Sequence, residues 1–235
     1  MFCRKQMLLV TVLTVSLAHP GLSGAAGSNE SSLGLGSRTS APAPLTLPGA
    51  GKLNPLQKAY VDAYSILSHV NSCSNFFGGS AAINALNGLT QSMQTTLMQR
   101  DIIVIMKGNT MIFTDPSGFS YRLFQRAEIN LNGPFYAGNQ LPGRAIIPRV
   151  GKFEPNTREA RVAALLHEVG HLVRGVDGRW LLPDDGWNSD VSRANTEKVI
   201  AICGGEIRQL KGITFEAELA DLQTPPRPEL VAGNK

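Results

Sequence analysis

Residues 159–173 read EARVAALLHEVGHLV, and this segment constrains the fold more than any other part of the chain. It is apolar on most sides, a pattern that predicts a central helix packed on nearly every face. The same segment carries His167, Glu168 and His171 within five residues. Burying polar and charged groups costs free energy unless they are paired or bound to something. A single core histidine is ordinary, whereas three such residues together indicate a binding site.

The spacing of the two histidines suits a metal ion. Residues four apart lie on the same face of a helix, one turn from each other. The imidazole nitrogens of His167 and His171 can therefore converge on one Zn²⁺ ion at ~2.0–2.1 Å. Glu168 lies one step around the helix, where a base can take a proton from a water activated by zinc. We therefore expect His167 and His171 as metal ligands and Glu168 as the catalytic base.

The stretch LLHEVGHLV at 165–173 resembles the active-site helix of the zincin metallopeptidases, an HExxH helix beneath an edge strand that holds the substrate. The order of helix, sheet, active-site helix and C-terminal helix across 53–212 resembles that family more loosely. Within the family, the chain is most similar to uncharacterised secreted bacterial proteins with a Pro-containing Asp turn after the motif. The matching residues here are LLPDDG at 181–186, Ser192, Asn195, Thr196, Val199 and Cys203. The resemblance implies a zincin-like α+β fold and peptidase activity.

The third metal ligand is less constrained by the sequence. A catalytic zinc usually takes three protein ligands and keeps one position for water. The LLPDDG turn offers Asp184 and Asp185, and the resemblance to the secreted group favours Asp185. Glu197, 26 residues after the second histidine, is the ligand that a gluzincin arrangement would use. Asp177 occupies the metzincin position, but Arg174 stands where those enzymes have glycine, and no methionine follows the motif.

The N-terminal residues predict export from the cell. Arg4 and Lys5 precede the apolar run MLLVTVLTVSLA at 7–18, and small residues follow it. The run is shorter than the ~20 residues of a membrane-spanning helix. Residues 1–25 therefore predict a signal peptide cleaved near Ala25. No later segment is long and apolar enough to span a membrane, so we expect a secreted or periplasmic protein.

Removal of the signal peptide changes the charge and the cysteine count. Lys+Arg falls from 22 to 20 against 18 Asp+Glu, so the net charge falls from +4 to +2. Without a cluster of basic residues, this balance does not indicate nucleic-acid binding. Cys73 and Cys203 remain after Cys3 is lost. An even pair in an oxidising compartment predicts one disulfide, and two buried free thiols are the alternative.

Composition divides the mature chain into three parts. Residues 26–52 are rich in Gly, Ser, Pro and Ala, which predicts a flexible low-complexity spacer. Residues 223–235 predict a disordered tail for the same reason. The intervening residues 53–222 are enough for one domain with its own core. Helices around an antiparallel or mixed sheet would make this an α+β domain.

Periodicity predicts helices over 55–70 and, less clearly, over 80–99. Asn156 is the expected N-cap of the HExxH helix, with Glu159 completing a capping box. The last helix is expected to begin near Ser189 or Ser192, and the Gly204–Gly205 pair should weaken or kink it.

The strands are predicted between these helices. The runs DIIVIM and NTMIFT flank KG, which predicts a hairpin, and DPSG predicts a turn before FSYRLF. RAEINLNG is expected as a separate strand, with Ala127, Ile129 and Leu131 on its buried face. This strand is also a candidate edge for binding an extended peptide.

Two functions are compatible with these features. The leading hypothesis is a secreted zinc peptidase acting on a peptide or protein substrate, with Glu168 as the base and Tyr121, Tyr136 or Arg174 as candidate groups for stabilising the tetrahedral intermediate. The alternative is a binding or scaffold protein whose metal is structural or whose histidines only pack. The sequence leaves the oligomeric state and the substrate open.

Overall fold

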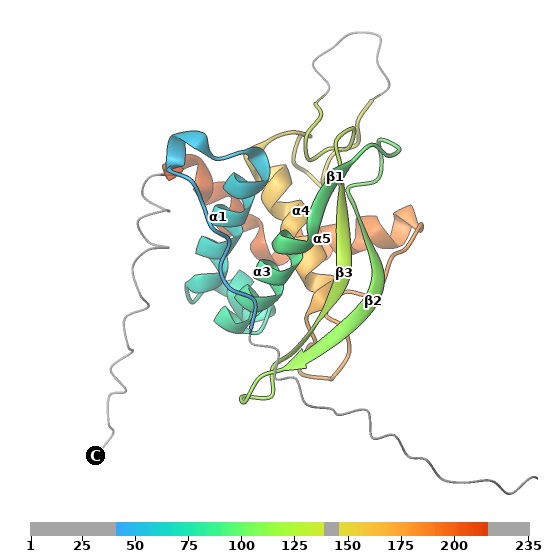
Figure 1. The fold of residues 1–235 in the computed structure, drawn as a ribbon. Coiled ribbons are helices and arrows are strands. Elements are labelled where there is room, and N and C mark those ends of the chain that lie inside the picture. The colour runs from blue at the N-terminus through green and yellow to red at the C-terminus, as the bar shows by residue number, and fades with distance from the viewer. Residues whose placement is uncertain (1–40, 139–145, 216–235) are drawn as a thin grey trace, which may run out of the picture. The chain divides into compact units, whose positions relative to one another are not determined.

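The computed structural model describes residues 41–138 and 146–215, so the predicted signal peptide and the predicted tail at 223–235 lie outside the described residues. Within these ranges the chain is α+β, as predicted, with five α-helices and one three-stranded sheet (Figure 1). The helices are α1 (Pro55–Ser68), α2 (Ser72–Phe76), α3 (Ala82–Ser92), α4 (Arg158–Leu172) and α5 (Ser189–Gln209). The strands are β1 (Met93–Thr96), β2 (Val104–Thr114) and β3 (Ser120–Asn130).

The packed part of the chain begins before the predicted boundary at residue 53. The backbone carbonyl of Pro42 accepts a hydrogen bond from the Asn87 side chain of α3 at 3.2 Å. The backbone N–H of Leu45 donates to the Tyr60 hydroxyl of α1 at 3.2 Å. Leu45 and Leu47 also pack against the core. The end of the predicted spacer is therefore part of the domain.

The first helices begin where local signals place them, but the second is shorter than predicted. Asn54 caps α1 through a capping box with Gln57, and Pro55 takes the first helical position. The helix predicted over 80–99 ends at Ser92, because residues 93–96 form β1 and pair in parallel with β3. The β-branched Thr95 and Thr96 suit a strand, and pairing with β3 satisfies the backbone groups that a longer helix would have used.

The sheet has the order β1-β3-β2 and is mixed, with β2 and β3 antiparallel. The predicted DPSG turn is confirmed, since the backbone N–H of Asp115 donates to the carbonyl of Phe119 at 2.9 Å. The hairpin predicted at KG is wrong. β2 continues through Gly108, which has φ 84°, and the register shifts between Lys107 and Thr110. A glycine with positive φ fits a β-bulge as well as a turn, and pairing with β3 decides between them.

β3 joins two segments that were predicted as separate strands. Ala127 and Ile129 are buried as expected, but Leu131 lies beyond the strand and is 40% exposed. Asn130 is buried instead, and its side-chain oxygen accepts from the backbone N–H of Met98 at 2.9 Å. Because β3 pairs on both sides, it is the central strand. It therefore offers no free edge to a peptide, which corrects the predicted role of RAEINLNG.

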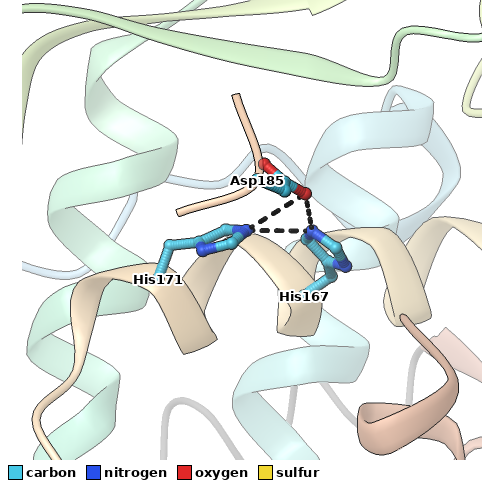
Figure 2. Close-up of side chains that lie close together, drawn as sticks. All are labelled: His167, His171 and Asp185. Atoms are coloured by element: carbon cyan, nitrogen blue, oxygen red, sulfur yellow. Dashed lines mark hydrogen bonds and ion pairs between the residues drawn. The ribbon is translucent and has the colours of Figure 1, made fainter. Parts of the chain in front are cut away.

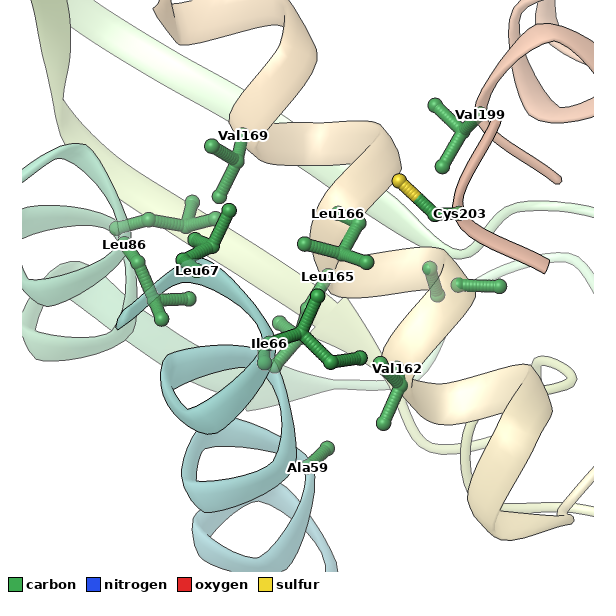
Figure 3. Packing of buried hydrophobic residues seen from close by; sticks show 14 of the residues in the cluster. Ala59, Ile66, Leu67, Leu86, Val162, Leu165, Leu166, Val169, Val199 and Cys203 are labelled. Carbon is green, nitrogen blue, oxygen red and sulfur yellow. The ribbon is translucent and has the colours of Figure 1, made fainter. Parts of the chain in front are cut away.

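Helix α4 is the centre of the domain. It packs against α1, α3, α5 and β3, and every residue from 162 to 172 is buried. Figure 3 shows its apolar side chains between those of α1, α3 and α5. Its N-cap is Thr157, whose hydroxyl accepts from the backbone N–H of Ala160, and not Asn156 as predicted. Asn156 has φ 64° and precedes the cap, so it belongs to the entering turn.

Helix α5 completes the core behind α4. It begins at Ser189, one of the two predicted starts, after the N-cap residue Asn188. The helix runs through the Gly204–Gly205 pair to Gln209. The predicted disulfide is confirmed, and the Cys73–Cys203 bond attaches α2 to α5 across 130 residues of sequence. In the described residues, no helix combines the length and apolar character needed to cross a bilayer.

Candidate metal centre

Three side chains from two parts of the chain meet at the buried surface of α4 (Figure 2). His167 and His171 extend from successive turns of α4, and Asp185 approaches from the loop before α5. The Nε2 atoms of the two histidines are 3.0 Å apart. Asp185 Oδ2 lies 3.1 Å from His167 Nε2 and 3.5 Å from His171 Nε2. Within the described ranges this is the one group of His, Cys, Asp or Glu arranged to hold a metal ion.

The triangle formed by these three atoms has the size that zinc needs. A point equidistant from the three atoms lies about 1.9 Å from each. Moving that point about 0.9 Å out of the plane lengthens each distance to ~2.0–2.1 Å, the normal length of zinc bonds to imidazole nitrogen and carboxylate oxygen. The donor set and its spacing therefore fit Zn²⁺.

The positions and partners of the histidine nitrogens also suit a bound cation. Two imidazole nitrogens at 3.0 Å repel each other unless a proton or a metal ion lies between them. His171 Nδ1 is buried and has no hydrogen-bond partner among the described residues, so His171 interacts with the cluster through Nε2. His167 Nδ1, in contrast, lies 2.9 Å from the hydroxyl of Thr196 on α5.

Thr196 fixes the tautomer of His167. The Thr196 hydroxyl donates its proton to the backbone carbonyl of Ser192 at 3.0 Å, as threonines in helices commonly do. Its oxygen is then an acceptor for a proton on His167 Nδ1. With that proton on Nδ1, the lone pair of Nε2 points toward Asp185 and His171. Hydrogen bonds of this kind orient a histidine ligand and raise its basicity.

The loop that carries Asp185 is attached to α4 and α5. The backbone N–H of Leu182 donates to the carbonyl of Gly170 at 3.0 Å, and Asn195 donates from its side chain to the carbonyl of Pro183 at 2.9 Å. Gly170 allows this approach, since a Cβ at that position would lie 2.5 Å from Leu182 Cδ1. The glycine inside the HEVGH motif thus has a packing role, and its partner is the loop that carries Asp185.

Asp184 is not part of the cluster and forms an ion pair with Arg122 of β3. The Arg122 Nε–H donates to the backbone carbonyl of His171 at 2.9 Å, and its guanidinium lies 4.3 Å from the centre of the Trp180 ring. Arg122 thereby connects the sheet, the end of α4 and the ligand loop. Of the two candidate aspartates, one binds this arginine and the other meets the histidines.

The electrostatics of the cluster favour positive charge between the three residues. Burial alone would raise the pKa of Asp185, but hydrogen bonds and charge from His167 and His171 hold that pKa well below its usual range. Burial alone would lower the pKa of His171, yet Asp185 and Glu168 raise it above its ordinary value. Burial raises the pKa of the Glu168 carboxyl, while the two histidines oppose the increase. A cation near Glu168 would favour its ionised form further.

The other residues considered from the sequence lie apart from this cluster. Glu197 is exposed on the outer face of α5, and Asp177 is exposed and accepts a hydrogen bond from the backbone N–H of Arg179. Tyr121 is buried against Phe113 in a stacked pair. The remaining candidate helpers are Tyr136, which is half-buried beside Phe135, and Arg174, which is exposed over the ring of Trp180.

Three supporting residues gave little signal in the sequence. Asn195 and Thr196 are among the residues on which the predicted resemblance to secreted bacterial proteins rests, but that resemblance assigns them no role. Arg122 lies in a strand 49 residues from the carbonyl that it binds, so no local spacing reveals it. Comparison of the chain with protein families, with curated proteins and with solved structures finds no significant match.

Proposed function

We propose that this protein is an exported zinc-dependent peptidase with a zincin-like active site, in which His167, His171 and Asp185 hold the metal. The observation that carries the proposal is the buried triangle of His167 Nε2, His171 Nε2 and Asp185 Oδ2, with Glu168 adjacent on the same helix. The disulfide between Cys73 and Cys203 suits an oxidising compartment, which supports export through the predicted signal peptide.

A zinc ion bound at this position would supply a Lewis acid that polarises a peptide carbonyl and lowers the pKa of water. Glu168 provides the acid–base chemistry. Its carboxylate accepts a proton from the attacking water and then delivers that proton to the nitrogen of the leaving amine. Glu168 is buried beside the two histidines on α4, which is the place that this role requires. Thr196 keeps the proton of His167 on Nδ1 during these steps.

The decisive test separates metal binding from catalysis. Wild-type protein should contain about one zinc per chain by plasma mass spectrometry, and a His167→Ala, His171→Ala double variant should contain none. Glu168→Gln keeps the shape of the side chain but removes the base. It should retain zinc and lose about 10²–10⁴-fold in kcat/KM on a quenched-fluorescent peptide library. Equal hydrolysis by Glu168→Gln and wild type would falsify the assignment of the base.

One observation supports a non-catalytic alternative. The three residues already contact one another directly, since His167 Nε2 lies 3.1 Å from Asp185 Oδ2. A scaffold with a purely structural metal would need only this cluster and not Glu168. Removal of metal would then lower the thermal midpoint of the protein without abolishing any hydrolysis. Exchange of water at the metal, measured by relaxation of a Co²⁺-substituted sample, would exclude a fully protein-ligated structural site.

A further inference from the structure

The outer face of α5 carries a second feature that the metal centre does not explain. Gly204 and Gly205 lie inside the helix, where each glycine costs about 1 kcal/mol relative to alanine. A Cβ on Gly204 would lie 3.2 Å from Lys152 Nζ and 3.5 Å from an Arg208 guanidinium nitrogen. A Cβ on Gly205 would meet nothing within 4 Å. The glycine pair therefore leaves a depression in the helix surface beneath two cationic side chains.

This depression is part of a pocket of about 540 Å³ between α5 and the loop at 149–152. The volume is within the range of ~300–1,000 Å³ that is common for small-ligand sites. The residues that line the pocket are Arg149, Gly151, Lys152, Arg193, Glu197, Ile200, Ala201, Gly205 and Arg208. Four of them are cationic and one is a carboxylate, which gives the lining a net charge of +3.

Two of the four cations are already paired with acids. Arg149 forms an ion pair with Glu154, and Arg193 pairs with Asp190 at 2.9 Å. Lys152 and Arg208 have no acidic partner in the part of the chain that the structure describes. The Lys152 ammonium and the Arg208 guanidinium nevertheless both lie next to the position that a Cβ on Gly204 would take. Two like charges brought together in this way repel each other unless an anion lies between them.

We propose that this pocket binds the phosphate group of a small hydroxylated phosphate ester. A phosphate monoester carries close to two negative charges at neutral pH, which matches the two cations that lack an acidic partner among the described residues. Arg208 can bind two phosphate oxygens through its planar guanidinium, and Lys152 adds a point charge. Glu197 accepts a hydrogen bond from a hydroxyl of the ligand, and Ile200 and Ala201 provide an apolar wall. The pocket lies beside Thr196 on α5, but none of its lining residues belongs to the His167, His171 and Asp185 cluster, so it does not depend on the proposed peptidase activity.

Calorimetry on the purified protein, with its metal content left unchanged, tests this assignment. The probes are glycerol 1-phosphate, inorganic phosphate and, as an uncharged control, glycerol. We expect saturable binding of glycerol 1-phosphate, weakened about 10-fold or more by Lys152→Gln or by Arg208→Gln and lost in the double variant. Lys198→Gln, on the same helix but outside the pocket lining, should change the affinity less than about 2-fold.

A second variant guards against loss of binding through misfolding. Gly205→Leu fills the open space without removing charge, and it improves the helix propensity at an exposed position. It should abolish binding while the thermal midpoint stays equal or rises. The proposal is overturned if neither phosphate probe binds, if the double variant binds as well as wild type, or if Gly205→Leu keeps full affinity.

The same variants identify the source of the phosphate. Flotation with phosphatidylglycerol vesicles, compared with phosphatidylcholine vesicles, tests a lipid headgroup. Binding of the vesicles that disappears in the Lys152→Gln, Arg208→Gln double variant would assign the pocket to headgroups. Binding of glycerol 1-phosphate without binding of vesicles would assign it to a free phosphate ester. Vesicle binding that the double variant preserves would count against any role of this pocket at membranes.

Discussion

Helix α4 and the loop at 181–186 supply side chains to the same proposed metal centre, but they are held in place by different means. The two histidines lie on a helix that is buried along its whole second half, so their spacing follows from helix geometry. Asp185 lies on an irregular segment that packs against the glycine of HEVGH, the amide of Asn195 and, through Asp184, the guanidinium of Arg122. The comparison shows that the helical repeat alone brings the two histidines together. The position of Asp185 depends instead on packing of its loop against several elements.

The sharpest test of this comparison removes the ligand from the loop. Asp185→Ala should lower zinc affinity by more than the ~10–100-fold that loss of an outer hydrogen-bond partner usually costs. The measurement is competition with a fluorescent zinc chelator. Glu197→Gln and Asp177→Asn are matched controls, because both carboxylates are exposed away from the cluster. Normal affinity in Asp185→Ala, with a large loss in either control, would transfer the third ligand to that residue.

The orientation of the helix ligands is tested at Thr196. Thr196→Val keeps the shape of the side chain but removes the oxygen that accepts from His167 Nδ1. Zinc affinity should fall about 10–100-fold, while Thr196→Ser should remain close to wild type. The same chelator competition provides the measurement. If the valine and serine variants bind zinc equally well, the hydroxyl does not orient His167.

The packing of the 181–186 loop on α4 is tested by comparing a helical glycine that contacts this loop with one that does not. Gly170→Ala places a Cβ against the buried Leu182 and should destabilise the fold by about 1–2 kcal/mol, after the gain in helix propensity is subtracted. Gly205→Ala meets no atoms within 4 Å and should stabilise the protein by up to about 1 kcal/mol. Urea unfolding of both variants gives the comparison. Equal effects of the two substitutions would mean that Leu182 yields without cost.

The smallest effect is expected at Arg122. Its partner Asp184 has a side chain that is 66% exposed, so the ion pair is screened by solvent. Arg122→Gln should weaken zinc binding less than about 10-fold, by loosening the loop and not by removing a ligand. Arg174→Gln is the control, because Arg174 also lies over Trp180 but is exposed. Identical zinc affinities of the two variants would show that Arg122 contributes only to stability.

Local signals in the sequence predicted the α+β class and the buried HEVGH helix, and they limited the start of α5 to the region of Ser189 and Ser192, where it begins at Ser189. They failed where tertiary pairing overrides a local pattern. The KG dipeptide, flanked by apolar runs, resembles a hairpin turn, but its residues bulge within one long strand because β3 continues alongside. Residues 93–96 follow a helix and become a strand because β3 offers them a partner.

The sequence by itself determined that His167, Glu168 and His171 share one buried helix, because the helical repeat places residues four apart on one face. It also predicted a Cys73–Cys203 disulfide by assigning Cys3 to the expected signal peptide, and the structure contains this bond. Only the tertiary structure decided that Asp185 meets the histidines while Asp184 binds Arg122. Adjacent residues in a loop point in directions that no short-range period fixes, so their partners depend on how α4, α5 and β3 pack around them.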